Sequence, residues 1–140
     1  MTNVMKPRDK EEVRALVAWA AAEEEPLEIL GAGTKRGLGR PLQTTRSVDL
    51  STLRGITLYE PDELVLGACA GTPLADIEAL LAENRQQLAF EPADLGPLYG
   101  AHVAAGTIGG AIACNLSGPR RIKAGAARDH FLGFTGVNGR

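Results

Sequence analysis

The stretch at residues 31–39, Gly-Ala-Gly-Thr-Lys-Arg-Gly-Leu-Gly, limits what this chain can fold into more than any other part of it. It follows the apolar run at residues 27–30, so we predict a strand that leads into a loop. Closely spaced glycines let main-chain N–H groups approach a ligand that a Cβ atom would exclude. Lys35 and Arg36 add positive charge to the same turn. The loop therefore suits a phosphate or pyrophosphate group, although by itself it fits a purely structural turn about equally well.

Two common phosphate-binding motifs do not fit this loop. The dinucleotide fingerprint Gly-x-Gly-x-x-Gly needs glycine at position 36, where arginine stands. It also needs a helix directly downstream, which Gly37, Gly39 and Pro41 oppose. The P-loop motif fails because no Gly-Lys-Ser/Thr follows at the required spacing. What remains is a strand followed by a glycine turn that no helix continues.

A second cluster of small residues, at 104–115, raises the case for a ligand. Gly109 and Gly110 at the opening of a short helix are expected to leave N–H groups and the positive end of the helix dipole available. Two separate small-residue loops are what a long dinucleotide needs. One would hold the pyrophosphate and the other would lie beside a ring.

The spacing of apolar residues predicts an α+β chain with a small sheet. Asp9 and Glu12 indicate a capping box, and Thr72 with Pro73 indicates the start of a second helix. The character of the chain changes after Phe90, where prolines and glycines become frequent, so we divide it into residues 1–90 and 91–140. The predicted elements are helices at 10–24 and 72–84 and strands at 27–30, 47–51, 55–59 and 64–70, the last two forming a hairpin.

Composition excludes several classes of protein. The 140 residues fit one domain or part of a larger one, and a net charge of −2 argues against nucleic-acid binding. Cys69 and Cys114 lack metal-ligand spacing and are predicted to be buried free thiols. No signal peptide or membrane-spanning run is evident, so we expect a cytoplasmic protein.

Neither histidine marks a catalytic or metal site. His102 and His130 have no carboxylate or cysteine at ligand spacing, so we assign them to loop or surface positions. Trp19 lies among alanines in the first helix and is predicted to belong to the core. We therefore predict no metal and no catalytic residue in this chain.

The order and spacing of these motifs resemble a known family. The chain is similar to the FAD-binding fold shared by vanillyl-alcohol oxidase and p-cresol methylhydroxylase, the PCMH-type fold, over essentially its whole length. Within that family it looks most like the E subunits of bacterial glycolate oxidases. The general resemblance rests on residues 30–34, 48–51, 67–74 and 106–110, and the narrower one on residues 88–92 and 116–121.

The resemblance implies a cofactor site for FAD. Residues 31–40 would form the pyrophosphate loop in a first FAD-binding subdomain, and residues 91–140 would begin a second, incomplete one. Thr34 stands where covalent-flavin members carry a histidine, so FAD is expected to bind non-covalently. Lys123 departs from the family, whose members often have an aromatic residue there. The implied pyrophosphate ligands are the main-chain N–H groups of Ala32, Gly33, Thr34, Lys35, Arg36, Gly37 and Leu38; the ribityl chain and flavin ring would lie along Thr107, Gly109 and Gly110, with Pro92, Ser117 and Gly118 completing the wall.

The resemblance also implies a function. It indicates a flavoprotein oxidoreductase acting on a 2-hydroxy acid such as glycolate, within a multi-subunit glycolate oxidase that has a second flavoprotein subunit and an iron–sulfur subunit. Those partners would hold the protein peripherally at the inner membrane. The rest of the FAD domain and the substrate-binding cap would follow Arg140, so we expect the 140-residue chain by itself to be inactive.

Two alternatives stay open from the sequence. One is a truncated, cofactor-free protein whose basic tail and apolar surface dock onto a partner subunit. The other is a different FAD enzyme on the same scaffold, such as the muramate-precursor reductase or a molybdenum-hydroxylase flavin subunit. An absorption spectrum separates the first alternative from the FAD-binding hypothesis.

Overall fold

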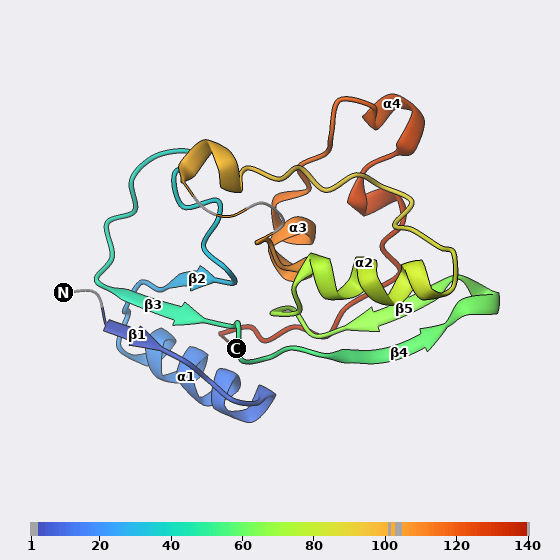
Figure 1. Cartoon of the computed structure of the whole chain (residues 1–140). Coiled ribbons are helices and arrows are strands. Elements are labelled where there is room, and N and C mark those ends of the chain that lie inside the picture. The colour runs from blue at the N-terminus through green and yellow to red at the C-terminus, as the bar shows by residue number, and fades with distance from the viewer. Residues whose placement is uncertain (1–2, 101, 103–104, 140) are drawn as a thin grey trace.

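The computed structural model describes residues 3–100, 102 and 105–139 and shows a mixed α/β chain with two small sheets (Figure 1). This confirms the predicted α+β class. The strands are β1 (Asn3–Met5), β2 (Glu28–Leu30), β3 (Arg46–Asp49), β4 (Ile56–Glu60) and β5 (Val65–Ala68). The helices are α1 (Lys10–Ala22), α2 (Leu74–Glu83), α3 (Ile108–Cys114) and α4 (Arg121–Ala124), with short 3-10 turns η1 (Pro61–Glu63), η2 (Gly96–Tyr99) and η3 (Ala127–Asp129).

The first sheet is parallel, with strand order β1–β3–β2. Val4 pairs with Ser47, and Ile29 pairs with Val48, so the carboxyl ends of the three strands meet at one edge. The glycine loop leaves the sheet at this edge, which is where parallel sheets bind ligands. The sequence did not predict β1, because three residues show no periodicity and their partner strand lies far along the chain.

Helix α1 begins where the sequence predicts. The Asp9 carboxylate accepts hydrogen bonds from the N–H groups of Glu11 (2.9 Å) and Glu12 (2.8 Å). The Glu12 side chain reaches back to the N–H of Arg8 (2.8 Å), one residue beyond the predicted partner. The helix start is therefore capped from both directions.

The prediction that Trp19 belongs to the core is wrong. Its side chain is 37% exposed, and Ala20 is the buried residue of α1. The Arg46 guanidinium lies 5.1 Å from the Trp19 ring centroid, and it also pairs with Glu25 (3.1 Å). The guanidinium over the indole face stabilises Trp19 although the side chain is partly exposed to solvent.

The second sheet is the predicted hairpin of β4 and β5, joined through η1. Helix α2 lies over the hairpin in Figure 1 and buries the predicted stripe, which includes Leu74, Ile77 and Leu81. Just beyond α2, the Gln86 side chain accepts from the Tyr59 hydroxyl (2.8 Å) and so ties the helix end to β4.

Thr72 does not cap α2 as predicted. The N-cap of α2 is Pro73, and no side chain caps this helix. Thr72 is 2% exposed. Its hydroxyl oxygen accepts a hydrogen bond from the Gly55 N–H (3.0 Å), and the hydroxyl donates to the Cys69 carbonyl (2.7 Å). The buried hydroxyl thus finds its hydrogen-bond partners in these main-chain groups rather than at the start of α2.

Helix α3 confirms the short helix predicted at Gly109 and Gly110, but its first N–H groups are not available to a ligand. The Gly109 N–H donates to the Ala70 carbonyl (2.9 Å), and the Gly110 N–H donates to Oγ1 of Thr107 (3.3 Å). A Cβ added at Gly109 would lie 2.7 Å from the Ala70 oxygen. The small residues here serve close backbone packing, as predicted, and that packing consumes the N–H groups.

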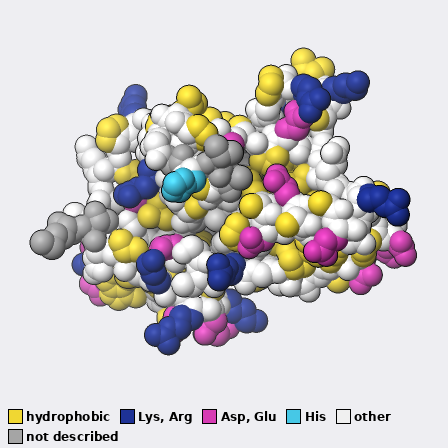
Figure 2. Space-filling view, in the orientation of Figure 1, with side chains coloured by type: hydrophobic (Ala, Val, Ile, Leu, Met, Phe, Trp, Pro, Cys, Tyr) yellow, Lys and Arg dark blue, Asp and Glu magenta, His cyan; other side chains and the backbone are white. Residues whose placement is uncertain are grey.

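The last third of the described chain exposes apolar side chains. Helix α4 projects from the body of the molecule, and Figure 2 shows basic and apolar side chains together on this projection. Ile122 is fully exposed there, while Leu132 and Phe134 are each 82% exposed. Cys114 is exposed and Cys69 half-buried, so the predicted burial of both thiols is wrong. No helix in the described residues is long and apolar enough to cross a membrane.

Candidate cofactor site

The glycine loop forms tight turns immediately after β2. Gly33 has a φ of +71°, a conformation that favours glycine. Two loop N–H groups are paired inside the loop, since Arg36 donates to the Gly33 carbonyl (3.2 Å) and Leu38 donates to the Lys35 carbonyl (3.0 Å). The Arg36 and Leu38 N–H groups were expected as pyrophosphate ligands. Because both are already paired, fewer N–H groups are available to a pyrophosphate than the sequence predicts. The other five N–H groups expected as ligands have no hydrogen-bond partner among the described residues: those of Ala32, Gly33, Thr34, Lys35 and Gly37.

A buried carboxylate anchors the loop to the parallel sheet. Glu28 in β2 is 8% exposed and forms two parallel bonds with Arg36, from Nε to Oε1 (2.8 Å) and from Nη2 to Oε2 (2.9 Å). The Ser47 hydroxyl of β3 donates to Oε2 as well (2.6 Å). The Ser47 hydrogen bond and the Arg36 guanidinium lower the pKa of Glu28 below its ordinary value, outweighing the effect of burial. Glu28 was not among the predicted site residues; its only signal is a carboxylate inside an apolar strand.

The structure brings the two small-residue loops into contact. A Cβ added at Gly31 would overlap Oγ1 of Thr107 and lie 3.2 Å from its Cγ2. Thr107 is 5% exposed and is held in place by an isolated β-bridge to Pro73. Further along the same strip, the Leu74 N–H donates to the Gly106 carbonyl (2.9 Å). The pyrophosphate loop and the start of α3 therefore form one continuous surface.

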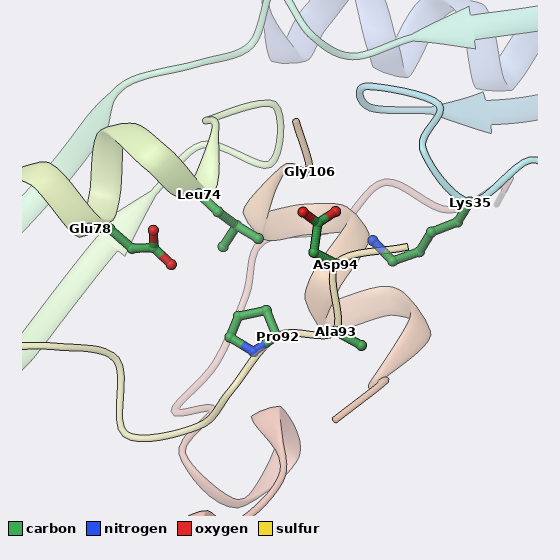
Figure 3. Close-up of a pocket in the computed structure, with 7 residues that line it drawn as sticks. All are labelled: Lys35, Leu74, Glu78, Pro92, Ala93, Asp94 and Gly106. Atoms are coloured by element: carbon green, nitrogen blue, oxygen red, sulfur yellow. The ribbon is translucent and has the colours of Figure 1, made fainter. Parts of the chain in front are cut away.

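Lys35 and Arg36 are neighbours in the chain, but their side chains reach different places. Arg36 turns to Glu28, whereas Lys35 lines a small pocket of about 80 Å³ together with Leu74, Pro92 and residues beside them. Figure 3 shows the Lys35 side chain extending toward the segment of Asp94, opposite Leu74 of α2. Within the described part of the chain, Lys35 makes no ion pair, but the carboxylate residues Glu78 and Asp94 line the same pocket, so the pocket carries charges of both signs.

A shallow hollow of about 520 Å³ lies on the other side of the loop, at the carboxyl ends of the parallel strands. Its cations are already neutralised, because Lys6 pairs with Asp49 (2.9 Å) and Arg36 pairs with Glu28 (2.8 Å). Burial raises the pKa of Asp49, but hydrogen bonds from Ser51 and Lys6 outweigh it and leave the pKa below its ordinary value. Ala32 and Gly33, whose N–H groups are unpaired in the described chain, line this hollow, whereas Lys35 lines the pocket described above.

The second wall of the candidate site consists of Pro92, Ser117 and Gly118. An isolated β-bridge pairs Pro92 with Ser117, and the Gly118 N–H donates to the Glu91 carbonyl (3.0 Å). Arg120 closes this wall with an ion pair to Glu91. The Ser117 Oγ atom is buried and has no hydrogen-bond partner within the described chain, which leaves one polar group available at this wall.

The two histidines lie where the sequence places them, at exposed positions. The His130 ring stacks on Phe90, with the ring centroids 6.2 Å apart. Across the described residues, no group of histidine, cysteine and acidic side chains is arranged to hold a metal ion.

A family model described as a FAD binding domain matches residues 1–140. The chain belongs to the FAD-binding domain family. Glycolate oxidase subunit GlcE of Escherichia coli K12 is 43% identical over 120 residues, which cover 86% of this chain and 32% of that protein. D-lactate dehydrogenase of Archaeoglobus fulgidus is 34% identical over 136 residues, covering 96% of this chain and 28% of the relative. This FAD-binding domain therefore spans about a third or less of the length of these relatives.

Solved structures confirm the PCMH-type fold of this FAD-binding domain. An alkyldihydroxyacetonephosphate synthase structure superposes with a TM-score of 0.66 at 21% identity, covering 90% of this chain and 24% of that one. A variant of cholesterol oxidase from Brevibacterium sterolicum superposes with a TM-score of 0.57 at 23% identity, covering 82% of this chain and 21% of that one. At these identities the likeness concerns the fold alone.

Proposed function

We propose that this FAD-binding domain belongs to a flavoprotein oxidoreductase that acts on a 2-hydroxy acid such as glycolate. The 43% identity to a glycolate oxidase subunit and the 34% identity to a D-lactate dehydrogenase support this, because glycolate and D-lactate are both 2-hydroxy acids. Bound FAD supplies the redox chemistry by accepting a hydride from the substrate carbon that bears the hydroxyl group. The residues of this chain bind and orient the cofactor.

The observation that carries the proposal is the row of unpaired loop N–H groups beside Thr107. Those of Ala32, Gly33, Thr34, Lys35 and Gly37 can donate to pyrophosphate oxygens without breaking any bond in the described chain. Each N–H to a charged oxygen contributes roughly 1.5–3 kcal/mol. The Lys35 ammonium, which makes no ion pair in the described residues, adds a positive charge. These groups match a diphosphate in charge and donor chemistry.

In the proposed site, the flavin ring would lie beside the place where Gly31 of the glycine loop meets Thr107. Thr107, Gly109 and Gly110 would present a flat surface rather than free donors, because the Gly109 and Gly110 N–H groups are paired. The unpaired Ser117 hydroxyl would supply a hydrogen bond from the wall formed with Pro92 and Gly118. We further propose that FAD binds non-covalently, since Thr34 stands where covalent members of this fold carry histidine.

We also propose the assembly and organisation expected from the sequence. Residues 1–90 and 91–140 would belong to two FAD-binding subdomains, and the whole protein would join a second flavoprotein subunit and an iron–sulfur subunit. The support is that the 43% identical relative is itself named as a subunit. Such partners would hold a cytoplasmic protein peripherally at the inner membrane.

The test is titration of the purified 140-residue chain with FAD, followed by absorption in the blue and near-ultraviolet. We expect FAD to bind and FMN, which lacks the diphosphate bridge, to bind at least tenfold more weakly, as loss of one charged hydrogen bond implies. Lys35→Met should weaken FAD binding, while Lys10→Met, a matched change at the start of α1, should not. Equal affinity for FAD and FMN would contradict the pyrophosphate site.

A turnover assay tests the activity. With glycolate, D-lactate and a dye acceptor, we expect no turnover from the 140-residue chain alone, because it corresponds to only 32% and 28% of the lengths of the two relatives. Turnover of glycolate by the assembled protein would support the proposed substrate class. Turnover of neither 2-hydroxy acid by an assembled, FAD-loaded protein would refute it.

A cofactor-free interaction module is the second candidate, favoured by the exposure of Ile122, Leu132 and Phe134. Exposed apolar side chains of this kind mark contact surfaces. A colourless protein that also refuses added FAD would favour this candidate over the first.

A further inference from the structure

We infer that Glu28 is a positioning residue that holds the pyrophosphate loop in its binding conformation through Arg36. The inference deepens the FAD site proposed above and rests on it. Glu28 does not face the ligand-binding side of the loop: its carboxylate is buried in the sheet and touches Arg36 and Ser47. Its effect on the cofactor therefore passes entirely through the loop.

The loop has few other restraints. Two short turns join Arg36 to Gly33 and Leu38 to Lys35, but both lie within the loop; its packing contacts with other segments include those of Gly31 with Thr107 and of Gly37 with the Tyr99 ring. Among the described residues, the bonds from Arg36 to Glu28 are the only hydrogen bonds that join residues 31–40 to the rest of the chain. A glycine-rich segment without such a link populates many backbone conformations.

The geometry of this link suits positioning. Both guanidinium–carboxylate bonds are short, at 2.8 and 2.9 Å. Because the two bonds are parallel, they fix the orientation of the Arg36 side chain as well as its distance from Glu28. Ser47 on the neighbouring strand fixes the carboxylate in turn, by a 2.6 Å hydrogen bond. Strand β3, strand β2 and the loop are thereby joined through one carboxylate.

The same link decides which cation faces the ligand. Arg36 is neutralised by Glu28, whereas the adjacent Lys35 side chain makes no ion pair in the described residues and points into the pocket beside Gly106. Without Glu28, the 54% exposed Arg36 side chain would be released and the turn would lose its fixed orientation. The five unpaired N–H groups would then be aligned only part of the time. Apparent affinity falls in proportion to the fraction of molecules in the competent conformation.

The experiment compares the wild-type chain with Glu28→Gln, which keeps the shape of the side chain but cannot make two charged bonds to Arg36. Hydrogen exchange of the Arg36 and Leu38 N–H groups, the two that are hydrogen-bonded inside the loop, is measured without FAD, and FAD affinity is measured by titration. We expect faster exchange confined to the loop and roughly tenfold weaker FAD binding. Glu25→Gln is the matched control, because Glu25 also pairs with an arginine, Arg46, away from the loop.

A double-mutant cycle separates positioning from a general structural role. If Glu28 acts through Arg36, Glu28→Gln should weaken FAD binding little further in an Arg36→Met background. Arg36→Met alone leaves the buried Glu28 carboxylate without a cation, so the double variant, which removes both charges, provides the folded reference if either single variant proves unstable.

Three outcomes decide the matter. Unchanged loop exchange in Glu28→Gln overturns the inference, and so does full additivity of the two substitutions. Faster loop exchange in a chain whose wild type fails to bind FAD would uphold the positioning role and refute the FAD site, so the two failures are distinguishable.

Discussion

Gly31 and Thr107, from opposite ends of the chain, touch so closely that a methyl group on Gly31 would overlap the Thr107 hydroxyl. Thr107 is itself buried and bridged to Pro73, so it cannot easily give way. The contact makes the pyrophosphate loop and the start of α3 dependent on each other. It also explains why glycine, rather than alanine, follows strand β2.

Gly31→Ala should therefore weaken FAD binding and lower the free energy of unfolding by about 1–3 kcal/mol, the usual cost of overpacking. Thermal unfolding and FAD titration check this. Adding Thr107→Ala, which removes Oγ1 and Cγ2, should restore part of the loss. Gly133→Ala is the control, since a Cβ there meets no atom within 4 Å. Equal stability of Gly31→Ala and Gly133→Ala would show that the loops are not in contact.

Gly71→Ala should be among the most destabilising single changes in the chain. Gly71 is buried, and its added Cβ would lie 2.8 Å from the Leu53 oxygen and closer still to that of Leu50. These are main-chain atoms that cannot rotate away, so we expect a loss of about 3 kcal/mol or more by chemical denaturation. Gly106→Ala, also at a buried position but with ordinary contacts to Leu74, should cost much less.

Thr72→Val should destabilise the turn between β5 and α2. Valine fills the same space but removes the acceptor of the Gly55 N–H, and loss of one such hydrogen bond costs about 0.5–1.5 kcal/mol. Thr72→Ser keeps the hydroxyl and should behave much more like the wild type. Denaturant unfolding of the three proteins tests the order; a valine variant as stable as the serine variant would mean that the hydroxyl contributes little.

Acid should destabilise the chain partly through Glu28. Its pKa lies below the ordinary value of 4.5 because Ser47 and Arg36 favour the ionised form. The resulting stabilisation is complete above that ordinary value and is lost as the pH falls through the lower pKa of the folded state. The stability difference between wild type and Glu28→Gln should therefore be largest near neutral pH and shrink in acid. A difference that stays constant as the pH falls would contradict this assignment.

Much of the fold could be predicted because its signals are local. The Asp9 cap, the apolar stripe of α2 and the alternating strands of the β4–β5 hairpin are visible in short windows of sequence. The features that escaped prediction are long-range. Strand β1 exists only through its pairing with β3, and Thr72 turns from its own helix to Gly55 on another segment.

The same distinction applies to the site. The glycine pattern at residues 31–39 predicts a loop with available N–H groups, and five such groups are unpaired in the described chain. The pattern could not show that Arg36 and Leu38 use their own N–H groups to close turns. Nor could it show that Ala70 accepts the Gly109 N–H, because that bond depends on how two distant segments pack.

Trp19 is the chain's single tryptophan, and it lies beneath the Arg46 guanidinium. Its fluorescence emission consequently reports one boundary of the molecule, where the first helix meets the parallel sheet. A shift of the emission maximum on addition of FAD, as distinct from the loss of intensity that absorption by the flavin causes, would mean that ordering of the loop is transmitted through the strands to the far end of β3. An unchanged spectrum would mean that the loop becomes ordered without affecting the surroundings of α1.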